Sequence, residues 1–481
     1  MEKQQLYKLA EEWAGAIPEK VECLAGAGSN RSYYRFTFGN RTIIGVTGTS
    51  TDENKAFVYL ANHFRSKKLP VPEVYAVSYD YSCYLQEDLG SFSLFDVVAQ
   101  GRETGNFSND ERALLADTIA QLPKFQFEGA KGLDSSRCYP QPSFDRRTVL
   151  WDLNYFKYCF LKLTGIEFRE DLLENDFETL ANELLEEVSD TFMYRDFQSR
   201  NVMVKEGKPY FIDFQGGRRG PVYYDVASFT GQAKANFPSE IREELLQHYL
   251  KALQPYHDIS REHFSEKLRL FSFFRTLQVL GAYGFRGHIE HKSHFAQSIP
   301  FAIERLRSLL QGANKTPYLT SVLKEITEMP RFCPQPAPDG LTVTVTSFSF
   351  HKGVPEDLSG NGGGFVFDCR ALPNPGRYDE YKQLTGYDQP VIDFFTRHRA
   401  IYDFIDETKP MIDRAVETYK KRGFKNLMVS FGCTGGQHRS VFAARHIAGY
   451  IAQTFGVRVV LNHREQKTGQ IFPPQPPTPQ P

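Results

Sequence analysis

The chain of 481 residues is long enough for two to four folded units of roughly 100 to 200 residues each. Hydrophobic residues (41%) and charged residues (24%) occur in the proportions of an ordinary globular protein. The 57 basic residues are balanced by 58 acidic ones, which excludes a general basic field that would hold nucleic acid or a membrane surface.

The seven cysteines occur singly, with no Cys-x-x-Cys pair, which excludes a zinc-ligand cluster and a disulfide-stapled fold. The N-terminal segment is amphipathic and lacks the apolar run of a signal peptide. The most apolar internal stretch, 270–285, is interrupted by Arg275. We therefore expect a soluble, cytoplasmic protein with reduced thiols and no membrane span.

The first part of the chain, to about residue 110, predicts an α+β lobe. Segments rich in β-branched and aromatic residues at 33–38, 42–46 and 84–86 have the composition of strands. Between the last two, the side chains of Ala56, Phe57, Leu60 and Phe64 recur on one face of a helix.

A glycine- and serine-rich loop precedes the first of these strands. Gly26, Gly28, Ser29 and Asn30 are small or polar, so their backbone N–H groups can approach phosphate oxygens, and Arg31 adds a positive charge. Such a loop is also typical of a plain hairpin.

A hinge and a helical region follow. Glu87 and Leu89 lie at the end of the strand 84–86, where the backbone between two lobes would meet a purine. Residues 111–188 and 238–310 have mostly helical periodicity, and a turn-rich stretch with short strands separates them. This order predicts a bilobal enzyme.

The aromatic segment 151–158 has two interpretations. Aromatic residues at helical spacing, here Trp151, Tyr155 and Phe156, are more often core than ligand-binding. Asp152 and Asn154 remain candidates for contacts with an acceptor.

Three polar residues of the turn-rich stretch have the types and order that phosphoryl transfer needs. Asp196 and Asn201 are five residues apart, and Asp213 ends an apolar strand. The oxygens of Asn201 and Asp213 suit Mg²⁺, and Asp196 can orient and deprotonate an acceptor hydroxyl. Isolated residues of these types more often cap turns, but the combined order favours phosphoryl transfer.

With these motifs, residues 5–315 resemble the aminoglycoside phosphotransferase and choline kinase superfamily, and most of all the anomeric amino-sugar kinases that phosphorylate N-acetylmuramate and N-acetylglucosamine at the 1-hydroxyl. The resemblance implies a protein-kinase-like fold, ATP or another nucleoside triphosphate, Mg²⁺ and a small hydroxylated acceptor. By position it makes Asp196 the catalytic base, Asn201 and Asp213 the metal ligands, and Asp225 a structural acid.

Two departures keep an alternative open. Tyr194-Arg195-Asp196 stands where the family usually has His-Gly-Asp, and the third strand, 42–46, offers no lysine for the nucleotide phosphates. A pseudokinase scaffold is the alternative, whereas Arg31, Arg41 or Lys55 would compensate in an active enzyme.

Four prolines in the nine residues 330–338 predict an extended linker over 329–340. The kinase-like domain is therefore expected over 1–328 and a smaller α/β domain over 341–466. The proline-rich end, 467–481, is predicted to be a disordered tail, with a ligand for a proline-binding groove as the alternative.

The smaller domain contains a candidate anion site. Strand patterns at 341–350, 364–370 and 426–431 are followed by a glycine-rich turn and a helix from about Val441. A strand, a glycine-rich turn and a helix N-terminus together expose backbone N–H groups to an anion. The candidate phosphate-binding residues are Thr434, Gly435, Gly436, His438, Arg439 and Ser440.

The same turn has two other interpretations. Cys433, five intervening residues, Arg439 and Ser440 match the loop of cysteine phosphatases, and Cys433 can also be a small buried residue. The sequences FSFHKGVP, FVFDCRALPNP and FGCTGGQHRSV make residues 341–466 similar to the C-terminal domain of the RapZ family. That resemblance implies binding of a sugar phosphate without catalysis.

The complete interpretation is an ATP-dependent kinase, with an alcohol or anomeric hydroxyl of an amino sugar as acceptor, fused to a regulatory domain that binds a sugar phosphate. The nearly uncharged tail argues against RNA as a partner, since phosphate contacts require clustered Lys and Arg. The rival is a pseudokinase scaffold whose second domain senses a sugar phosphate or binds RNA or protein. The sequence leaves homo-oligomerisation open.

Overall fold

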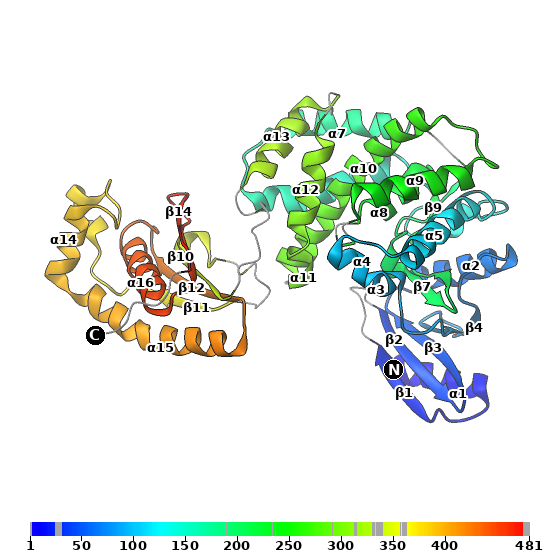
Figure 1. Ribbon diagram of the computed structural model, residues 1–481, viewed down its shortest axis with the longest axis horizontal. Coiled ribbons are helices and arrows are strands. Elements are labelled where there is room, and N and C mark those ends of the chain that lie inside the picture. Colours follow the sequence, from blue (N-terminus) through cyan, green and yellow to red (C-terminus); the bar gives the residue numbers. More distant parts are fainter. Residues whose placement is uncertain are drawn as a thin grey trace. The chain divides into compact units, whose positions relative to one another are not determined.

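A computed structural model describes residues 2–24, 31–187, 190–232, 234–235, 237–290, 292–311, 315–329, 332, 340–355, 357 and 363–474. Its contacts divide the chain into two compact units (Figure 1). The first unit is 1–285 with 298–333, and the second is 286–297, which carries α11 (Ser293–Ala296), with 334–481. The change of unit after Cys333 falls inside the predicted linker.

The N-terminal lobe of the first unit is a five-stranded antiparallel sheet in the order β1-β2-β3-β5-β4. Neighbouring residues of its strands enter different cores: Ile43 packs toward α1, whereas Ile44 packs in the core that contains α2. This alternation is the two-residue period of a strand covered on both faces. The elements of the lobe are α1 (Glu2–Ala14), β1 (Lys20–Leu24), β2 (Arg31–Phe38), β3 (Arg41–Gly48), α2 (Thr51–Ser66), β4 (Val74–Val77) and β5 (Cys83–Glu87).

Helix α2 has the buried face that the sequence predicts, with Ala56, Phe57, Leu60 and Phe64 in the core. The helix begins where the Ser50 side chain accepts a hydrogen bond from the Glu53 N–H, as an N-cap does. The predicted α+β lobe is therefore confirmed.

The C-terminal lobe is mainly helical, as predicted, with two short antiparallel ribbons embedded in it. Its helices are α3 (Leu94–Val97), α4 (Ala99–Thr104), α5 (Asn109–Phe127), α6 (Arg146–Phe156), α7 (Glu170–Leu184), α8 (Tyr223–Thr230), α9 (Ser239–Leu253), α10 (Arg261–Gly284), α12 (Ile299–Leu309) and α13 (Pro317–Glu328). The ribbons pair β6 (Phe192–Met193) with β9 (Arg218–Arg219) and β7 (Val202–Lys205) with β8 (Lys208–Phe211).

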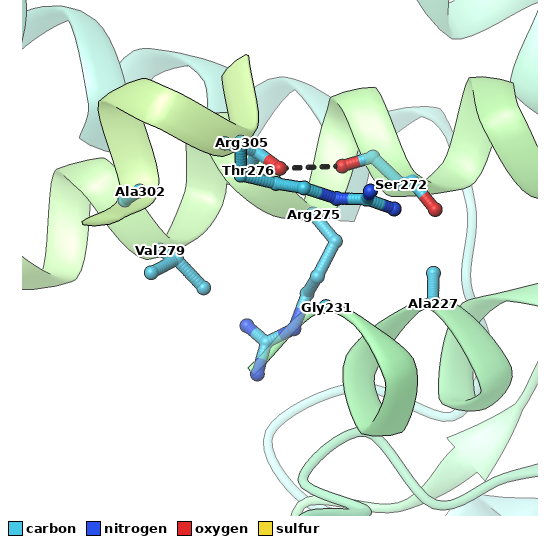
Figure 2. A pocket seen from close by; sticks show the side chains of 8 residues that line it. All are labelled: Ala227, Gly231, Ser272, Arg275, Thr276, Val279, Ala302 and Arg305. Carbon is cyan, nitrogen blue, oxygen red and sulfur yellow. Dashed lines mark hydrogen bonds between the residues drawn. The ribbon is translucent and has the colours of Figure 1, made fainter. Parts of the chain in front are cut away.

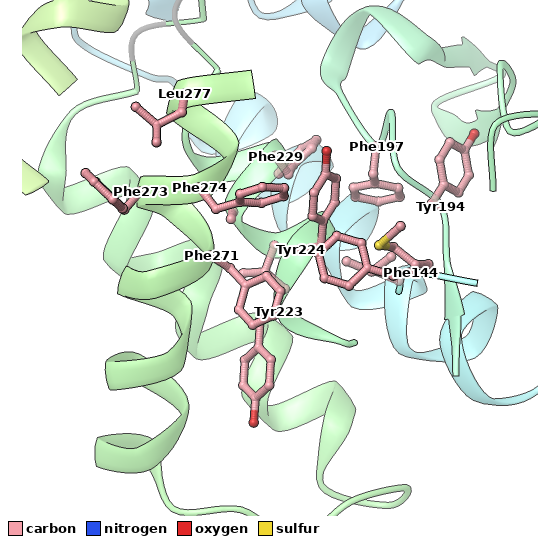
Figure 3. Packing of buried hydrophobic residues seen from close by; sticks show 14 of the residues in the cluster. Phe144, Tyr194, Phe197, Tyr223, Tyr224, Phe229, Phe271, Phe273, Phe274 and Leu277 are labelled. Atoms are coloured by element: carbon pink, nitrogen blue, oxygen red, sulfur yellow. The ribbon is translucent and has the colours of Figure 1, made fainter. Parts of the chain in front are cut away.

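An aromatic core fixes α8 against α10 (Figure 3). The rings of Tyr223 and Phe271 stack with centroids 5.4 Å apart, and Tyr224 meets Phe274 edge-on at 6.3 Å. Such ring pairs contribute about 0.5–1.5 kcal/mol beyond the area they bury. Helix α8 carries Asp225 and α10 carries Arg275, so this packing sets the distance between two polar groups discussed below.

Further along α10, two glycines let the helix approach the backbone of α6 and of the π-helical turn Lys157–Leu161 that follows α6. A Cβ at Gly281 would lie 2.8 Å from Phe156 N, and one at Gly284 would lie 2.0 Å from Cys159 O. Both distances are shorter than real Cβ contacts, so the helices meet closely only because these residues lack side chains.

The aromatic segment 151–158 agrees with the core prediction only in part. Phe156 is buried as predicted, but half of the Trp151 side chain is exposed.

The second unit is an α/β domain, as predicted. Its sheet has the order β11-β12-β10-β13-β14, and β10, β11, β12 and β13 run parallel. Its core is separate from that of the first unit and contains Val345, Val429 and Ile447. The elements are β10 (Thr342–Ser349), β11 (Phe365–Asp368), α14 (Gln389–His398), α15 (Ala400–Arg422), β12 (Asn426–Cys433), α16 (Arg439–Phe455), β13 (Arg458–His463) and β14 (Thr468–Phe472).

The prediction of a disordered tail over 467–481 is wrong for its first residues. Residues 468–472 form β14, an edge strand antiparallel to β13. An edge strand pairs on one side only, so the prolines that follow it do not interrupt a ladder. Residues 475–481 lie outside the described part of the chain. Within that part, none of the helices is long and apolar enough to cross a membrane.

Candidate active site and a second candidate anion site

The loop that carries Asp196 is braced by buried charges. Asp225 on α8 is fully buried and accepts hydrogen bonds from the backbone N–H groups of Tyr194, at 2.7 Å, and Arg195, at 2.8 Å. Burial raises the pKa of the Asp225 carboxyl to about 7. The role of Asp225 as a structural acid is consistent with both bonds.

Arg195 replaces the glycine of the family motif in a conformation that suits glycine. Its φ of +76° lies in the left-handed region, which costs an ordinary residue roughly 1–3 kcal/mol. An ion pair offsets part of this cost, because Arg195 Nη2 lies 2.8 Å from Oδ1 of Asp152 on α6. Asp152, a candidate for acceptor contacts in the sequence, therefore holds the loop instead.

The predicted base, Asp196, is open to a substrate. Its side chain is 40% exposed, and one carboxylate oxygen, Oδ1, lies 3.3 Å from Nη2 of Arg275 on α10. An acceptor hydroxyl can therefore reach the carboxylate, while the guanidinium fixes its orientation.

The two predicted metal ligands are neighbours in the structure. The N–H of Ile212, next to Asp213, donates to the carbonyl of Asn201 at 3.0 Å. Asn201 Nδ2 donates to the carbonyl of Asp196 at 2.8 Å, which leaves its amide oxygen as the donor atom for a cation. The carboxylate and amide oxygens of Asp213 and Asn201 fit Mg²⁺. Among the described residues, no group of three or more His, Cys, Asp or Glu side chains could hold a metal ion.

A polar chain that the sequence did not reveal links β2 to Asp213. Arg31 is buried and its Nη2 lies 3.1 Å from Oε1 of Glu53 on α2. Gln215 donates to the same Glu53 oxygen at 3.4 Å and to Oδ1 of Asp213 at 2.7 Å. Glu53 and Gln215 were missed because each becomes meaningful only through contacts between distant segments. The available signals were the position of Gln215, two residues after Asp213, and that of Glu53, in the first turn of the helix.

This polar chain of side chains distinguishes the three basic residues that the sequence offers as a replacement for the missing lysine. Lys55 is half exposed and pairs with Asp52 along its own helix, and Arg41 is exposed at the start of β3. Of these three residues, Arg31 is the one that the described contacts connect to Asp213, a predicted metal ligand.

The other predicted nucleotide-binding residues are partly described. Gly26, Gly28, Ser29 and Asn30 lie outside the described residues. The side chain of Glu87 pairs with Lys205 at 2.8 Å, and Leu89 is buried in the core. Because both side chains are already in contact with other residues, a purine bound at this hinge would form its hydrogen bonds with backbone groups.

In the second unit, the strand β12, the glycine-rich turn and α16 follow one another as predicted. The Gly436 N–H donates to Cys433 Sγ at 3.2 Å, and Ser440 Oγ lies 3.1 Å from the same sulfur. Thr434 and Gly435 are exposed. The strand, the glycine-rich turn and the helix thus occur in the order that an anion site requires, and the Gly436 N–H is already engaged by Cys433.

Three of the predicted phosphate-binding side chains are engaged within the protein rather than presented to solvent. Arg439 Nη1 donates to the carbonyls of Arg370, at 2.8 Å, and Leu372, at 3.0 Å. His438 contacts the Tyr381 carbonyl, and its burial lowers its pKa. Ser440 is fully buried against Cys433. The Nε of Arg439 is buried, and none of the residues that the structure describes accepts a hydrogen bond from it.

A second buried histidine lies at the end of β13. His463 Nδ1 is 2.8 Å from Ser347 Oγ, and its Nε2 is 2.9 Å from Tyr387 OH. Burial lowers the pKa of His463 to about 4, and the nearby Arg445 acts in the same direction.

Comparisons with known proteins agree with this division. The model of the phosphotransferase enzyme family matches residues 23–263, and that of the RapZ C-terminal domain matches residues 341–467. A nucleotide-binding protein of Staphylococcus epidermidis is 37% identical over 124 residues, which are 26% of this chain and 39% of that protein. One of Paraburkholderia xenovorans is 35% identical over 175 residues, or 35% of this chain and 56% of that protein. The chain thus spans less than two thirds of the length of these relatives.

Solved structures with low identity are also similar. An ADP-bound aminoglycoside phosphotransferase, APH(2'')-Ib, has a TM-score of 0.44 at 12% identity, covering 69% of this chain and 99% of that one. The choline kinase LicA from Streptococcus pneumoniae has a TM-score of 0.43 at 15% identity, covering 64% and 98%.

Proposed function

This chain belongs to the phosphotransferase enzyme family, and on that premise we propose that its first unit is an active ATP-dependent kinase of a small hydroxylated molecule. The observation that carries the proposal is the arrangement of Asp196, Asn201 and Asp213: one exposed carboxylate beside two neighbouring oxygen donors, on a loop braced by Asp225.

The chain's own residues would divide the reaction between them. Asp196 accepts the proton of the acceptor hydroxyl as its oxygen attacks the terminal phosphorus of ATP, while the bond from that phosphorus to the bridging oxygen breaks and ADP leaves. Asn201 and Asp213 would hold Mg²⁺, which neutralises charge on the phosphates when it is bound. Arg275 orients the carboxylate of Asp196 through their 3.3 Å contact.

The absence of a lysine on the third strand does not leave the phosphates without a cation. In this proposal Arg31, at the start of β2, takes that place, because its ion pair with Glu53 on α2 joins a strand cation to a helix carboxylate. The guanidinium supplies a fixed fork of donors for phosphate oxygens. This pairing supports an active kinase over the pseudokinase alternative.

For the acceptor we propose an amino sugar phosphorylated at its anomeric hydroxyl. The support is the resemblance of the motifs around Arg31, Asp196 and Asp213 to the amino-sugar kinases.

The test is ATP turnover by the full chain with Mg²⁺ against N-acetylglucosamine, N-acetylmuramate, choline and an aminoglycoside, with the product bond identified by ³¹P NMR. Asp196→Asn is expected to lower kcat by about 10²- to 10⁴-fold, since the amide cannot accept the proton, while MgATP binding measured by calorimetry stays unchanged. Turnover that survives this substitution would reject Asp196 as the base. Binding of MgATP by wild type without transfer to any acceptor would favour the pseudokinase scaffold.

For the second unit we propose binding of an amino-sugar phosphate without hydrolysis, as a regulator of the kinase in a cytoplasmic protein. The exposed Thr434 and Gly435, the N-terminus of α16 and the unpartnered Nε of Arg439 support an anion at this turn. The test is calorimetry with glucosamine 6-phosphate, with phosphate release measured beside it. Release that Cys433→Ser abolishes would establish the phosphatase alternative instead.

A further inference from the structure

A small cavity opens between α8, α10 and α12 (Figure 2), and one of the residues that line it, Arg275, contacts the predicted base. Arg275 from α10 and Arg305 from α12 both line it, together with small or hydroxyl-bearing residues such as Ser272 and Thr276. Since Arg275 also contacts Asp196 Oδ1, a molecule whose hydroxyl lies at Asp196 would have its neighbouring groups at this cavity.

Arg305 is a cation without a counter-ion in the described part of the chain. No described carboxylate lies within ion-pair distance of it, and its Nε is buried with no hydrogen-bond partner. Burial, together with the neighbouring positive charges of Arg242 and Arg269, lowers its pKa to about 10. The Arg305 side chain is half-buried, but its Nε donor is buried and unsatisfied among the described residues. An unsatisfied buried donor is costly, so an anion from outside the protein would complete the site.

Further positive charges lie near Arg275, in addition to the carboxyl groups of Asp196 and Asp225 on which Arg275 acts. Arg200 and Arg275 both act electrostatically on Tyr283 of α10, and Arg200 acts on Lys234. Asp196 is the carboxylate paired with Arg275, and it is the group that the acceptor hydroxyl would approach. A cationic acceptor would therefore meet like charges next to the reacting oxygen, where repulsion costs most.

We propose that the acceptor of this kinase carries a negative charge, a carboxylate or a phosphate, which Arg305 and Arg275 bind while its hydroxyl lies at Asp196. This inference rests on the proposed kinase activity and adds a substrate class to it: anionic sugars are accepted, and cationic aminoglycosides and choline are rejected.

The experiment uses three probes with the same ring: N-acetylglucosamine, which is neutral, N-acetylmuramate, which adds a carboxylate, and N-acetylglucosamine 6-phosphate. For the full-length wild type, kcat/KM is expected to be at least about 10-fold higher for one of the anionic probes than for the neutral one. Arg305→Gln should raise KM for that anion by about 10- to 100-fold with little change in kcat, and should leave the neutral sugar unaffected.

Arg307→Gln is the matched control, because Arg307 lies on the same helix, is part-exposed, and pairs with Glu304 outside the cavity. It should leave the preference for the anion unchanged. Arg275→Gln should lower kcat as well as raise KM, since Arg275 also orients Asp196. Equal effects of Arg305→Gln on charged and neutral sugars would overturn the proposal, as would faster phosphorylation of the neutral probe or of kanamycin.

The anion site can be tested even if the chain has no kinase activity. If no probe is phosphorylated, thermal shift of the full chain still reports binding. Stabilisation by an anionic sugar that N-acetylglucosamine does not produce and that Arg305→Gln removes would support the anion site without the activity. Equal shifts for all three probes, or none, would overturn the anion site as well.

Discussion

At the scale of single residues, Arg31 has the most specific consequence. It is the first residue of β2, it is buried, and its guanidinium reaches the Glu53–Gln215–Asp213 chain. The sequence alone offered Arg31, Arg41 and Lys55 as equivalent cations, and the contacts distinguish them.

Arg31→Met is therefore expected to raise the KM for ATP by about 10- to 100-fold, the range of a lost charge-assisted hydrogen bond. Arg31→Lys should recover part of the loss because it restores the charge but not the planar fork. Steady-state kinetics with varied MgATP makes the measurement. Lys55→Met is the control and should change little, so equal losses for the two positions would contradict the assignment.

His463 predicts a pH dependence of stability. Its pKa is about 4 in the folded protein and about 6.5 in an unfolded chain, so the unfolded state binds the proton first as the pH falls. The contribution of the neutral His463 to the free energy of unfolding is therefore complete above pH 6.5 and is lost as the pH falls through 4. It amounts to roughly 3 kcal/mol.

Urea unfolding of the full chain between pH 7 and 4, followed through the transition of the second unit, is the measurement. His463→Asn should make the loss of stability shallower than in wild type. His398→Asn, at an exposed position of α14, should leave the slope unchanged. Parallel slopes for wild type and His463→Asn would refute the buried, neutral histidine.

How much of the site the sequence predicts depends on how far apart its residues lie along the chain. Asp196, Asn201 and Asp213 lie within one short segment, so their spacing carries the chemistry and a family resemblance reinforces it. Glu53, Gln215 and Arg305 come from separate segments and acquire a role only when tertiary packing brings them together. Asp152 shows the converse, because a residue that looked available for a substrate is paired with Arg195.

At the scale of elements, the glycine-rich turn between β12 and α16 combines the proposed anion site with a structural contact. Arg439, the first residue of α16, holds the backbone carbonyls of Arg370 and Leu372 in the segment after β11. The same residue supplies the buried Nε that faces no partner. The proposed anion site and the position of this neighbouring segment therefore depend on the same side chain.

Arg439→Ala is thus expected to weaken sugar-phosphate binding and also to destabilise the second unit by about 1–3 kcal/mol, since two carbonyls lose their donor. Calorimetry and urea unfolding measure the two effects. Thr434→Val is the matched variant: it should weaken binding with little effect on stability, because its side chain is exposed. Unchanged stability of Arg439→Ala would show that its two backbone bonds contribute nothing.

Most elements were predictable because their hydrophobic periods are strong. The strands β2, β3, β10 and β12 and the helix α2 agree with the sequence patterns to within a few residues. The strand β14 was missed because a short, exposed edge strand followed by prolines has no buried face to produce a pattern. Its pairing with β13 comes from backbone hydrogen bonds, which residue types encode weakly.

At the scale of the whole molecule, the chain has separate hydrophobic cores. The hydrophobic cores of the first unit consist of residues between Leu6 and Phe332, and the core of the second unit consists of residues between Leu341 and Leu461. Among the described residues, the cores of the two units share none. Each therefore has its own source of folding free energy.

Residues 340–474 expressed alone are expected to fold. Their free energy of unfolding should agree, within about 0.5 kcal/mol, with that of the corresponding transition of the full chain. Calorimetry of the full chain should show two transitions. A single cooperative transition, or a fragment that lacks a sigmoidal unfolding curve, would contradict independent folding.

The close approach of α10 to α6 has a consequence for how this protein can evolve. Gly281 and Gly284 have no room for any side chain, so mutation at either position displaces the helix that carries Arg275. Arg305 lies on another helix and touches neither contact, so selection can exchange it without disturbing the loop of Asp196. Descendants of this gene that acquire a new acceptor are therefore expected to diverge at position 305 while they inherit both glycines unchanged, and a set of orthologues with assayed substrates would reveal that pattern.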